Sequence, residues 1–240
     1  MKLPSISTIV PVYNGAAFIE AALDSVLTQR VKSSEVIVIN DGSTDNTREI
    51  LRALSKYIIV IEQDNLGPAA ARNRGLERAT GELLAFLDAD DLWSGDALTQ
   101  LHEHIYEEPS LSGVLGHTQT FTQDGNDQVK QPTCEPYTAF HLGSALIRSE
   151  TFSQVGCFDE AMKFSEDVDW FMRARESGAQ FKLIKPLVLH YRRHENNITN
   201  VNRFDDLQLL KALKMSIDRR SGASNSLDLA KLQGQGDQHG

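Results

Sequence analysis

Three aspartates within four residues, Asp88, Asp90 and Asp91, form the part of the sequence best suited to chemistry. Carboxylates this close repel one another unless solvent or a cation compensates their charge. Hard oxygen ligands suit Mg²⁺ or Mn²⁺, which commonly bridge a carboxylate and a substrate diphosphate. The alternative is that these acids cap a helix beginning near Ser94, but capping accounts for one acid better than for three. The cluster therefore predicts a divalent metal site.

Three further side chains could bind a nucleotide, although each also has an ordinary structural explanation. Asp41 precedes a glycine in what would be a simple turn after a strand, or it binds a base or ribose. Tyr13 could flank a nucleobase or pack as a rim residue at a strand end. Arg72 could offer its planar guanidinium to a phosphate or base, or lie on a solvated helix face. The sequence leaves these alternatives open for each residue taken alone.

The elements before these residues must bring them together. Short, nearly continuous apolar runs are typical of strands buried on both faces of a parallel sheet, and they occur at 6–12, 35–39, 57–61 and 83–87. Helix-length stretches separate them at 16–29, 44–55 and 68–79. This alternation predicts an α/β doubly wound sheet. Because ligands bind beyond the carboxyl ends of parallel strands, the four polar loops that follow these runs should line one crevice.

After residue 91 the pattern changes. We expect helices at about 94–107, 166–177 and 205–218, and a polar loop at 123–138. Strand-like segments occur near 113–122, 140–148, 181–185 and 187–194.

Composition excludes several other classes of protein. A net charge of -9 and a pI of about 5.3 argue against a broad cationic surface for nucleic acid. The two cysteines form no CxxC pair, so neither a zinc site nor a disulfide framework is indicated. GxGxxG does not follow the first run, and a phosphate loop of the GxxxxGK[ST] type is absent. No signal peptide and no apolar stretch of membrane-spanning length is present, which predicts a cytoplasmic protein.

Seven ordered motifs across about residues 5 to 200 resemble those of glycosyltransferase family 2. They read IVPVYNG (9–15), VIVINDGSTDNT (36–47), NLGPAAARNRG (65–75), FLDADD (86–91), GCFDE (156–160), SEDVDW (165–170) and YRRHENN (191–197). The resemblance implies a GT-A (Rossmann-like) fold, with a central mostly parallel sheet flanked by helices and a smaller C-terminal acceptor-side subregion. It implies one domain over 1–218, with a nucleotide-sugar-binding half (1–91), an acceptor-side half (92–218) and a flexible tail (219–240).

The resemblance also implies where the donor would bind. Pro11, Tyr13 and Asp41 would form the pocket for the nucleoside base and ribose, usually uridine, and Arg72 would lie near the nucleotide. Further roles follow for the metal. Asp88 and Asp90 would form the DxD pair, with Asp90 reaching Mn²⁺ or Mg²⁺ most directly.

Two histidines and a carboxylate complete the implied site. His194 would approach the metal or the diphosphate, whereas His190 is a second candidate that is more simply explained as a packed strand residue. Asp167 would be the catalytic base, taking the proton of an acceptor hydroxyl in an inverting displacement. Glu166 and Asp167 could instead simply open a helix, where acids are favoured.

The implied activity is metal-dependent transfer of a sugar from a nucleoside-diphosphate sugar, usually a UDP-sugar. The acceptor would be a glycan, a lipid-linked molecule or another hydroxyl compound, and peripheral contact with the inner face of the membrane is compatible with the helix at 205–218. Two alternatives stay open. One is a nucleotide-sugar-binding protein without catalysis, and the other is a nucleotidyltransferase that makes nucleotide sugars and releases pyrophosphate.

Overall fold

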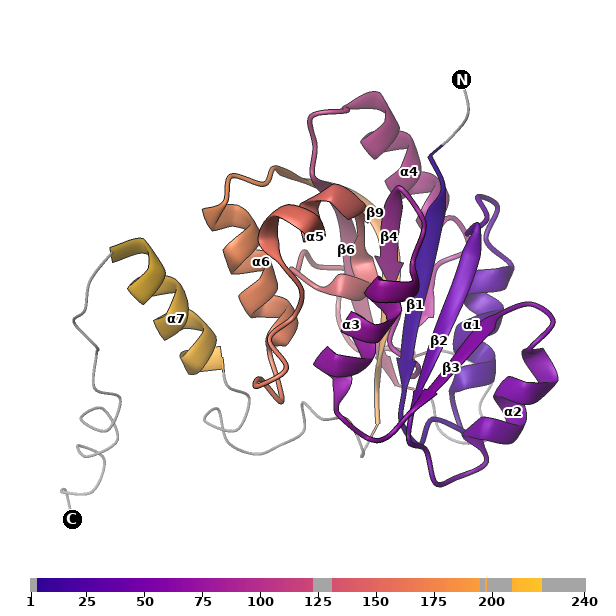
Figure 1. Cartoon of the computed structure of the whole chain (residues 1–240). Coiled ribbons are helices and arrows are strands. Elements are labelled where there is room, and N and C mark those ends of the chain that lie inside the picture. Colours follow the sequence, from indigo (N-terminus) through magenta and orange to yellow (C-terminus); the bar gives the residue numbers. More distant parts are fainter. Residues whose placement is uncertain (1–3, 123–130, 195–196, 198–208, 222–240) are drawn as a thin grey trace, which may run out of the picture.

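The molecule is built around one sheet of nine strands, with helices packed against both faces (Figure 1). The computed structural model describes residues 4–122, 131–194, 197 and 209–221. Along the sheet the strand order is β3-β2-β1-β4-β8-β6-β9-β5, with β7 paired to β6. This architecture confirms the predicted α/β fold with a central, mostly parallel sheet flanked by helices.

The first half of the sheet consists of the four strands that the apolar runs predicted. They are β1 (Ile6–Val12), β2 (Glu35–Asp41), β3 (Ile59–Gln63) and β4 (Leu83–Phe86), all mutually parallel. In β2, Val36 and Val38 belong to one core cluster, whereas Ile37 and Ile39 belong to another that includes Ala71 of the third helix. Burial on both faces is why this run is apolar without alternation.

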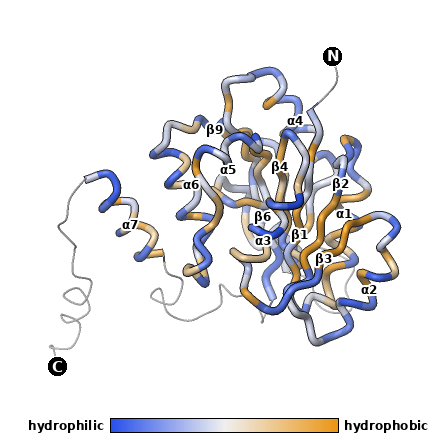
Figure 2. Tube along the Cα trace, in the orientation of Figure 1, coloured by the Kyte–Doolittle hydropathy of each residue, from blue (hydrophilic) through white to orange (hydrophobic). Residues whose placement is uncertain are grey.

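Two layers of helices cover the sheet. One face carries α1 (Ile19–Leu27), α2 (Thr47–Leu54) and α4 (Ala97–Glu107), which contribute side chains to one large core cluster. The other face carries α3 (Pro68–Arg78), α5 (Ser149–Val155) and α6 (Glu166–Glu176). Figure 2 shows the hydrophobic strands running between these layers, with polar residues along the outer sides of the helices. The first three helices are therefore those expected between the predicted strands.

The second half of the sheet mixes strand directions. Its strands are β5 (Leu92–Trp93), β6 (Gly113–Thr122), β7 (Gln131–Pro132), β8 (Ala145–Arg148) and β9 (Phe181–Arg193). β8 runs antiparallel between β4 and β6, while β6 and β9 are parallel. The two segments predicted at 181–185 and 187–194 form the single strand β9. Pro186 lies where the register with β6 shifts, since proline cannot donate to the ladder.

The last described helix, α7 (Leu209–Ser221), packs against α6. It overlaps the helix predicted at 205–218, of which 205–208 lie outside the described residues. Residues 219–221, which were expected to begin the flexible tail, continue α7, because Arg219 binds Glu176 and Asp169 of α6. The remainder of the predicted tail, 222–240, is also outside the described residues.

One sheet contains strands from both 1–91 and 92–218, which supports the proposal that residues 1–218 form one domain. Among the helices described, none has both the length and the apolar character needed to cross a bilayer.

Candidate functional site

A cavity of about 1320 Å³ opens beyond the carboxyl ends of the parallel strands. Of the residues proposed for the site from the sequence, Asp91 and His190 do not line it, whereas the others do: Pro11, Tyr13, Asp41, Arg72, Asp88, Asp90, Asp167 and His194. The rule that ligands bind at this edge of a parallel sheet therefore located the cavity correctly. His190 lies in β9 and packs edge-on against the ring of Phe121, at 6.1 Å between centroids, in agreement with its structural explanation.

Hydrogen bonds hold the loops after β1 and β2 together on one side of the cavity. The Asn14 side-chain carbonyl accepts a hydrogen bond from Thr44 N at 2.7 Å, and Asn14 N donates to Ser43 Oγ at 2.9 Å. Gly42 adopts φ +73°, and a Cβ there would lie 2.7 Å from the backbone N of Asn65. Only glycine permits this close approach of the loop after β2 to the loop after β3.

Asp41 is buried, and both of its carboxylate oxygens accept hydrogen bonds from backbone N–H groups. Its Oδ1 accepts from Leu66 N at 2.9 Å, and its Oδ2 accepts from Gly67 N at 2.9 Å. These bonds hold the loop that leads into α3 against the end of β2. Asp41 thus shapes the wall of the cavity, while the ring of Tyr13 stands at the rim with half of its surface exposed.

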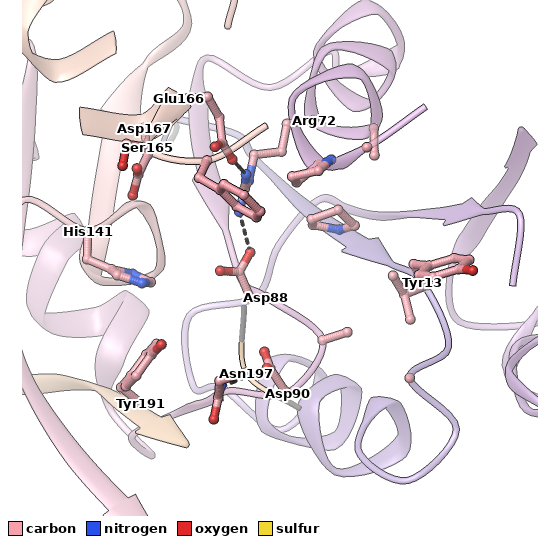
Figure 3. A pocket seen from close by; sticks show the side chains of 18 of the residues that line it. Tyr13, Arg72, Asp88, Asp90, His141, Ser165, Glu166, Asp167, Tyr191 and Asn197 are labelled. Carbon is pink, nitrogen blue, oxygen red and sulfur yellow. Dashed lines mark hydrogen bonds and ion pairs between the residues drawn. The ribbon is translucent and has the colours of Figure 1, made fainter. Parts of the chain in front are cut away.

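Arg72 links two sides of the cavity through a buried ion-pair network. From α3 its guanidinium donates to Asp88 Oδ1 at 2.6 Å and also pairs with Glu166 at the start of α6 (Figure 3). Burial alone would lower the pKa of Arg72, but the charges of Asp88 and Glu166 outweigh it and raise that pKa. Both terminal nitrogens of Arg72 therefore face carboxylates in this structure, and neither lies on a solvated helix face.

The pKa values of the two carboxyl groups paired with Arg72 are shifted in opposite directions. Burial, the largest single influence, would raise the pKa of Asp88, but the opposing influences, chiefly the charge and the hydrogen bond of Arg72, together lower that pKa. Burial raises the pKa of Glu166 despite Arg72, because Asp167 and Asp88 add negative charge nearby. Asp88 is thus held ionised at the floor of the cavity.

Asp90 faces two residues that follow β9. His194 Nε2 lies 3.0 Å from Asp90 Oδ2, and the Asn197 side chain lies 3.5 Å from the same oxygen. This contact places His194 and Asp90 side by side.

Asp91 gives the best test of whether a cation fits. It is fully buried, its Oδ1 accepts from Arg192 N at 2.8 Å, and its Oδ2 has no hydrogen-bond partner in the described part of the chain. Burial raises the pKa of Asp91 strongly, and the charges of Asp90 and Asp88 add to that effect. An unpaired acceptor beside two further carboxylates fits a divalent cation with hard oxygen ligands.

Asp167 projects into the cavity from the first turn of α6. Ser165, immediately before that helix, has φ +60°, a left-handed conformation uncommon for a non-glycine residue. Asp167 Oδ1 accepts from Val168 N at 2.8 Å, and its side chain is half-buried. The residue both opens a helix and lines the cavity, so the two explanations given for it are compatible.

His141 was not identified from the sequence. It precedes the short 3-10 helix η1 (Leu142–Ser144) and lines the cavity opposite Asp88 (Figure 3). Asp88, Asp91 and His141 each offer one ligand atom within 4.8 Å of the others. A single histidine in a loop carries no motif, and only the pairing of β8 beside β4 brings it to the acids.

Comparisons with known proteins point to one family. The sequence profile described as Glycosyl transferase family 2 matches residues 7–163. The uncharacterized glycosyltransferase RT0329 of Rickettsia typhi is 29% identical over 227 residues, which cover 86% of this chain and 70% of that protein. The minor teichoic acid biosynthesis protein GgaA of Bacillus subtilis is 27% identical over 218 residues, covering 82% of this chain and 49% of that protein.

A solved structure supports the fold. The crystal structure of S. aureus TarS in complex with UDP-GlcNAc superposes with a TM-score of 0.69 at 21% identity, covering 95% of this chain and 69% of that chain.

Proposed function

The chain belongs to glycosyl transferase family 2, and from this premise we propose that it transfers a sugar from a UDP-sugar to an acceptor hydroxyl with inversion. The observation that carries the proposal is the arrangement of carboxylates in one cavity. The acids after β4 line its floor, and Asp167 enters it from α6 (Figure 3). One group of acids suits a metal-bound diphosphate, and the separate carboxylate suits proton removal.

In the proposed reaction, an acceptor oxygen attacks the anomeric carbon as Asp167 takes the proton of that hydroxyl. The bond between the anomeric carbon and the diphosphate oxygen breaks, and UDP leaves with the electron pair. A bound Mn²⁺ or Mg²⁺ would offset the negative charge that grows on the diphosphate. Asp90, Asp88 and His194 are the residues proposed to hold it, and the unpaired Oδ2 of Asp91 adds a further acceptor beside them.

The nucleoside would lie at the other end of the cavity. Pro11, Tyr13 and Asp41 line that end together with the loop after β3. The exposed ring of Tyr13 is available to stack on a base, and the bonds of Asp41 keep the loop in place. Arg72 acts through Asp88 in this proposal, holding that carboxylate in its charged form.

Replacing Asp90 by alanine is expected to weaken UDP binding at least tenfold in the presence of Mn²⁺, and to leave the weaker metal-free binding unchanged. The reason is that the variant loses the carboxylate proposed to reach the metal most directly. Isothermal titration calorimetry with UDP, with and without Mn²⁺, measures both affinities. Asp96→Ala is the matched control, because Asp96 is exposed and lies outside the cavity.

Equal manganese-dependent affinity in the Asp90 variant and the wild type would refute the ligand role. If the wild type binds no UDP, titration with GDP, CDP and dTDP tests whether another base is preferred. Release of pyrophosphate rather than UDP in a turnover assay would favour a nucleotidyltransferase instead.

For the acceptor we propose a glycan, and for the location the cytoplasmic face of a membrane. The name of GgaA, a teichoic acid biosynthesis protein, supports the first suggestion. The second is supported by α7, on which Leu210, Leu213 and Ile217 form an exposed stripe. Lys211 and Lys214 lie beside the stripe, and such helices lie in the membrane interface.

Replacing both Leu213 and Ile217 by glutamate is expected to abolish flotation of the protein with vesicles rich in anionic phosphatidylglycerol. Both side chains are exposed, so the fold and the binding of UDP should be unchanged. Vesicle flotation measures the first outcome and calorimetry the second. Tyr57→Glu is the control, since Tyr57 is an exposed apolar residue far from α7 in sequence and next to α2. Wild-type protein that does not float would contradict the membrane contact.

A further inference from the structure

The tautomer of His141 is determined by its neighbours. The ring Nδ1 accepts a hydrogen bond from the backbone N–H of Gly143 at 3.0 Å. A nitrogen that accepts an N–H must carry a lone pair, so Nδ1 is unprotonated. The neutral imidazole then has its proton on Nε2, which makes that distal nitrogen a donor.

The fold holds this arrangement from several sides. The Gly143 carbonyl accepts from Nε1 of the buried Trp93 at 2.7 Å, which fixes the Gly143–Ser144 peptide next to the N–H that faces the ring. A Cβ at Gly143 would lie 3.1 Å from His141 Nδ1 and 3.0 Å from Leu189, so a side chain there would press on the imidazole. The Tyr191 ring packs edge-on against His141, with centroids 5.7 Å apart. These contacts leave the imidazole little freedom to turn.

The imidazole of His141 also lies close to two of the acids that follow β4. Figure 3 shows the imidazole reaching from the loop before η1 toward Asp88. A ring nitrogen of His141 lies within 4.8 Å of carboxylate oxygens of Asp88 and Asp91. Among the described residues, the hydrogen bonds of His141 include none to Nε2. The fold therefore presents an N–H donor to the cavity and does not itself use it.

We propose that His141 donates a hydrogen bond from Nε2 to a diphosphate oxygen of the donor substrate, and that it is not a metal ligand. The inference rests on the proposed function, in which the diphosphate is the group that meets these acids. A metal ligand needs a lone pair on Nε2. Supplying it would move the proton to Nδ1, where it would face the N–H of Gly143, donor against donor.

A fixed neutral donor suits the reaction. Negative charge grows on the leaving diphosphate, and a preorganised N–H aimed at that charge stabilises the transition state more than the ground state. Removing one such donor from an enzyme typically lowers turnover about 10²–10³-fold. His141 is therefore a binding residue that also assists departure of UDP.

Two near-isosteric variants separate the two nitrogens. In His141→Asn, Oδ1 replaces Nδ1 as the acceptor for Gly143 N–H, but the distal donor is lost. In His141→Gln, the side-chain amide replaces the distal donor, but the acceptor for Gly143 is lost. We expect the asparagine variant to bind Mn²⁺ like the wild type, to bind UDP with Mn²⁺ about tenfold more weakly, and to turn over UDP-sugar about 10²-fold more slowly. The glutamine variant should recover at least tenfold of that loss.

Calorimetric titration with Mn²⁺ alone, and then with UDP at saturating Mn²⁺, gives the first two affinities. A tenfold loss of Mn²⁺ affinity in both variants would overturn the proposal and make His141 a metal ligand. Wild-type UDP affinity and turnover in the asparagine variant would overturn it as well. If the wild type binds none of UDP, GDP, CDP and dTDP, the proposed function fails and the assigned diphosphate contact with it.

The tautomer can be tested without any ligand. Long-range ¹H–¹⁵N correlation spectra of ¹⁵N-histidine-labelled protein should show His141 protonated at Nε2, and its signal is assigned by its absence from the asparagine variant. The same pattern should persist with saturating Mg²⁺. Protonation at Nδ1, or loss of the Nε2 proton when Mg²⁺ is added, would contradict the proposal even if transfer activity is confirmed.

Discussion

Replacing Asp167 by asparagine is expected to lower turnover about 10²–10⁴-fold, the usual contribution of a positioned general base. The amide is nearly isosteric, and its oxygen can still accept from Val168 N, so the first turn of α6 should keep its conformation. An amide cannot take the proton of the attacking hydroxyl, and the loss should therefore fall on kcat. Release of UDP in a coupled assay with a UDP-sugar measures this effect.

Measuring the UDP affinity of the same variant distinguishes a loss of catalysis from a loss of folding. Asp167 lies on α6 and is not among the residues proposed to hold the metal, so manganese-dependent UDP affinity should equal that of the wild type. Glu150→Gln removes an acidic group from the first turn of α5 at an exposed position and serves as the control. An Asp167→Asn protein that is folded but no longer binds UDP would contradict the assignment, as would one with wild-type turnover.

The half of the fold that the sequence predicts best is the half with the strongest periodic signal. Strands β1, β2 and β4 are buried on both faces, so each appears as an apolar run between helix-length stretches. β3 lies at the edge of the sheet and is only partly buried, but its first three residues are still apolar. β5 has two residues and α5 has seven, which is too short for either period to be recognised. Pro186 divided β9 into two predicted strands, because proline is rare inside a sheet.

The candidate site, too, could be predicted only in part from the sequence. Its location follows from topology, since the loops after parallel strands share one edge. The partners of its residues do not follow, because they come from distant parts of the chain. Arg72 meets Glu166 across 94 positions, and Asp90 meets His194 across 104. The sequence could offer a solvated face or a phosphate for Arg72, but not the carboxylates that it contacts.

Arg72→Met is expected to lower the free energy of unfolding by about 3–5 kcal/mol, the usual cost of removing one partner from a buried ion pair. The side chains of Arg72 and Glu166 are only 8% and 7% exposed, so water cannot replace the lost guanidinium. Arg74→Met is a control on the same helix. Its ion pair with Glu77 is more than half exposed on both sides, and such pairs contribute about 0–1 kcal/mol. Urea unfolding followed by circular dichroism measures both variants.

The double variant Arg72→Met/Glu166→Gln tests the cause of that loss. If the cost comes from an uncompensated buried carboxylate, removing the charge of Glu166 should restore part of the stability. Recovery should be incomplete, because Asp88 also loses its 2.6 Å partner, although its side chain is 32% exposed and water can solvate it. Equal destabilisation by Arg72→Met and Arg74→Met would show that the buried ion pair contributes no more than the exposed one. A double variant less stable than Arg72→Met alone would show that the cost does not come from an uncompensated charge on Glu166. If the ion pairs stabilise the protein, they also matter for function. The Arg72 guanidinium joins Asp88, which is proposed to hold the metal, to α6, the helix that carries Asp167.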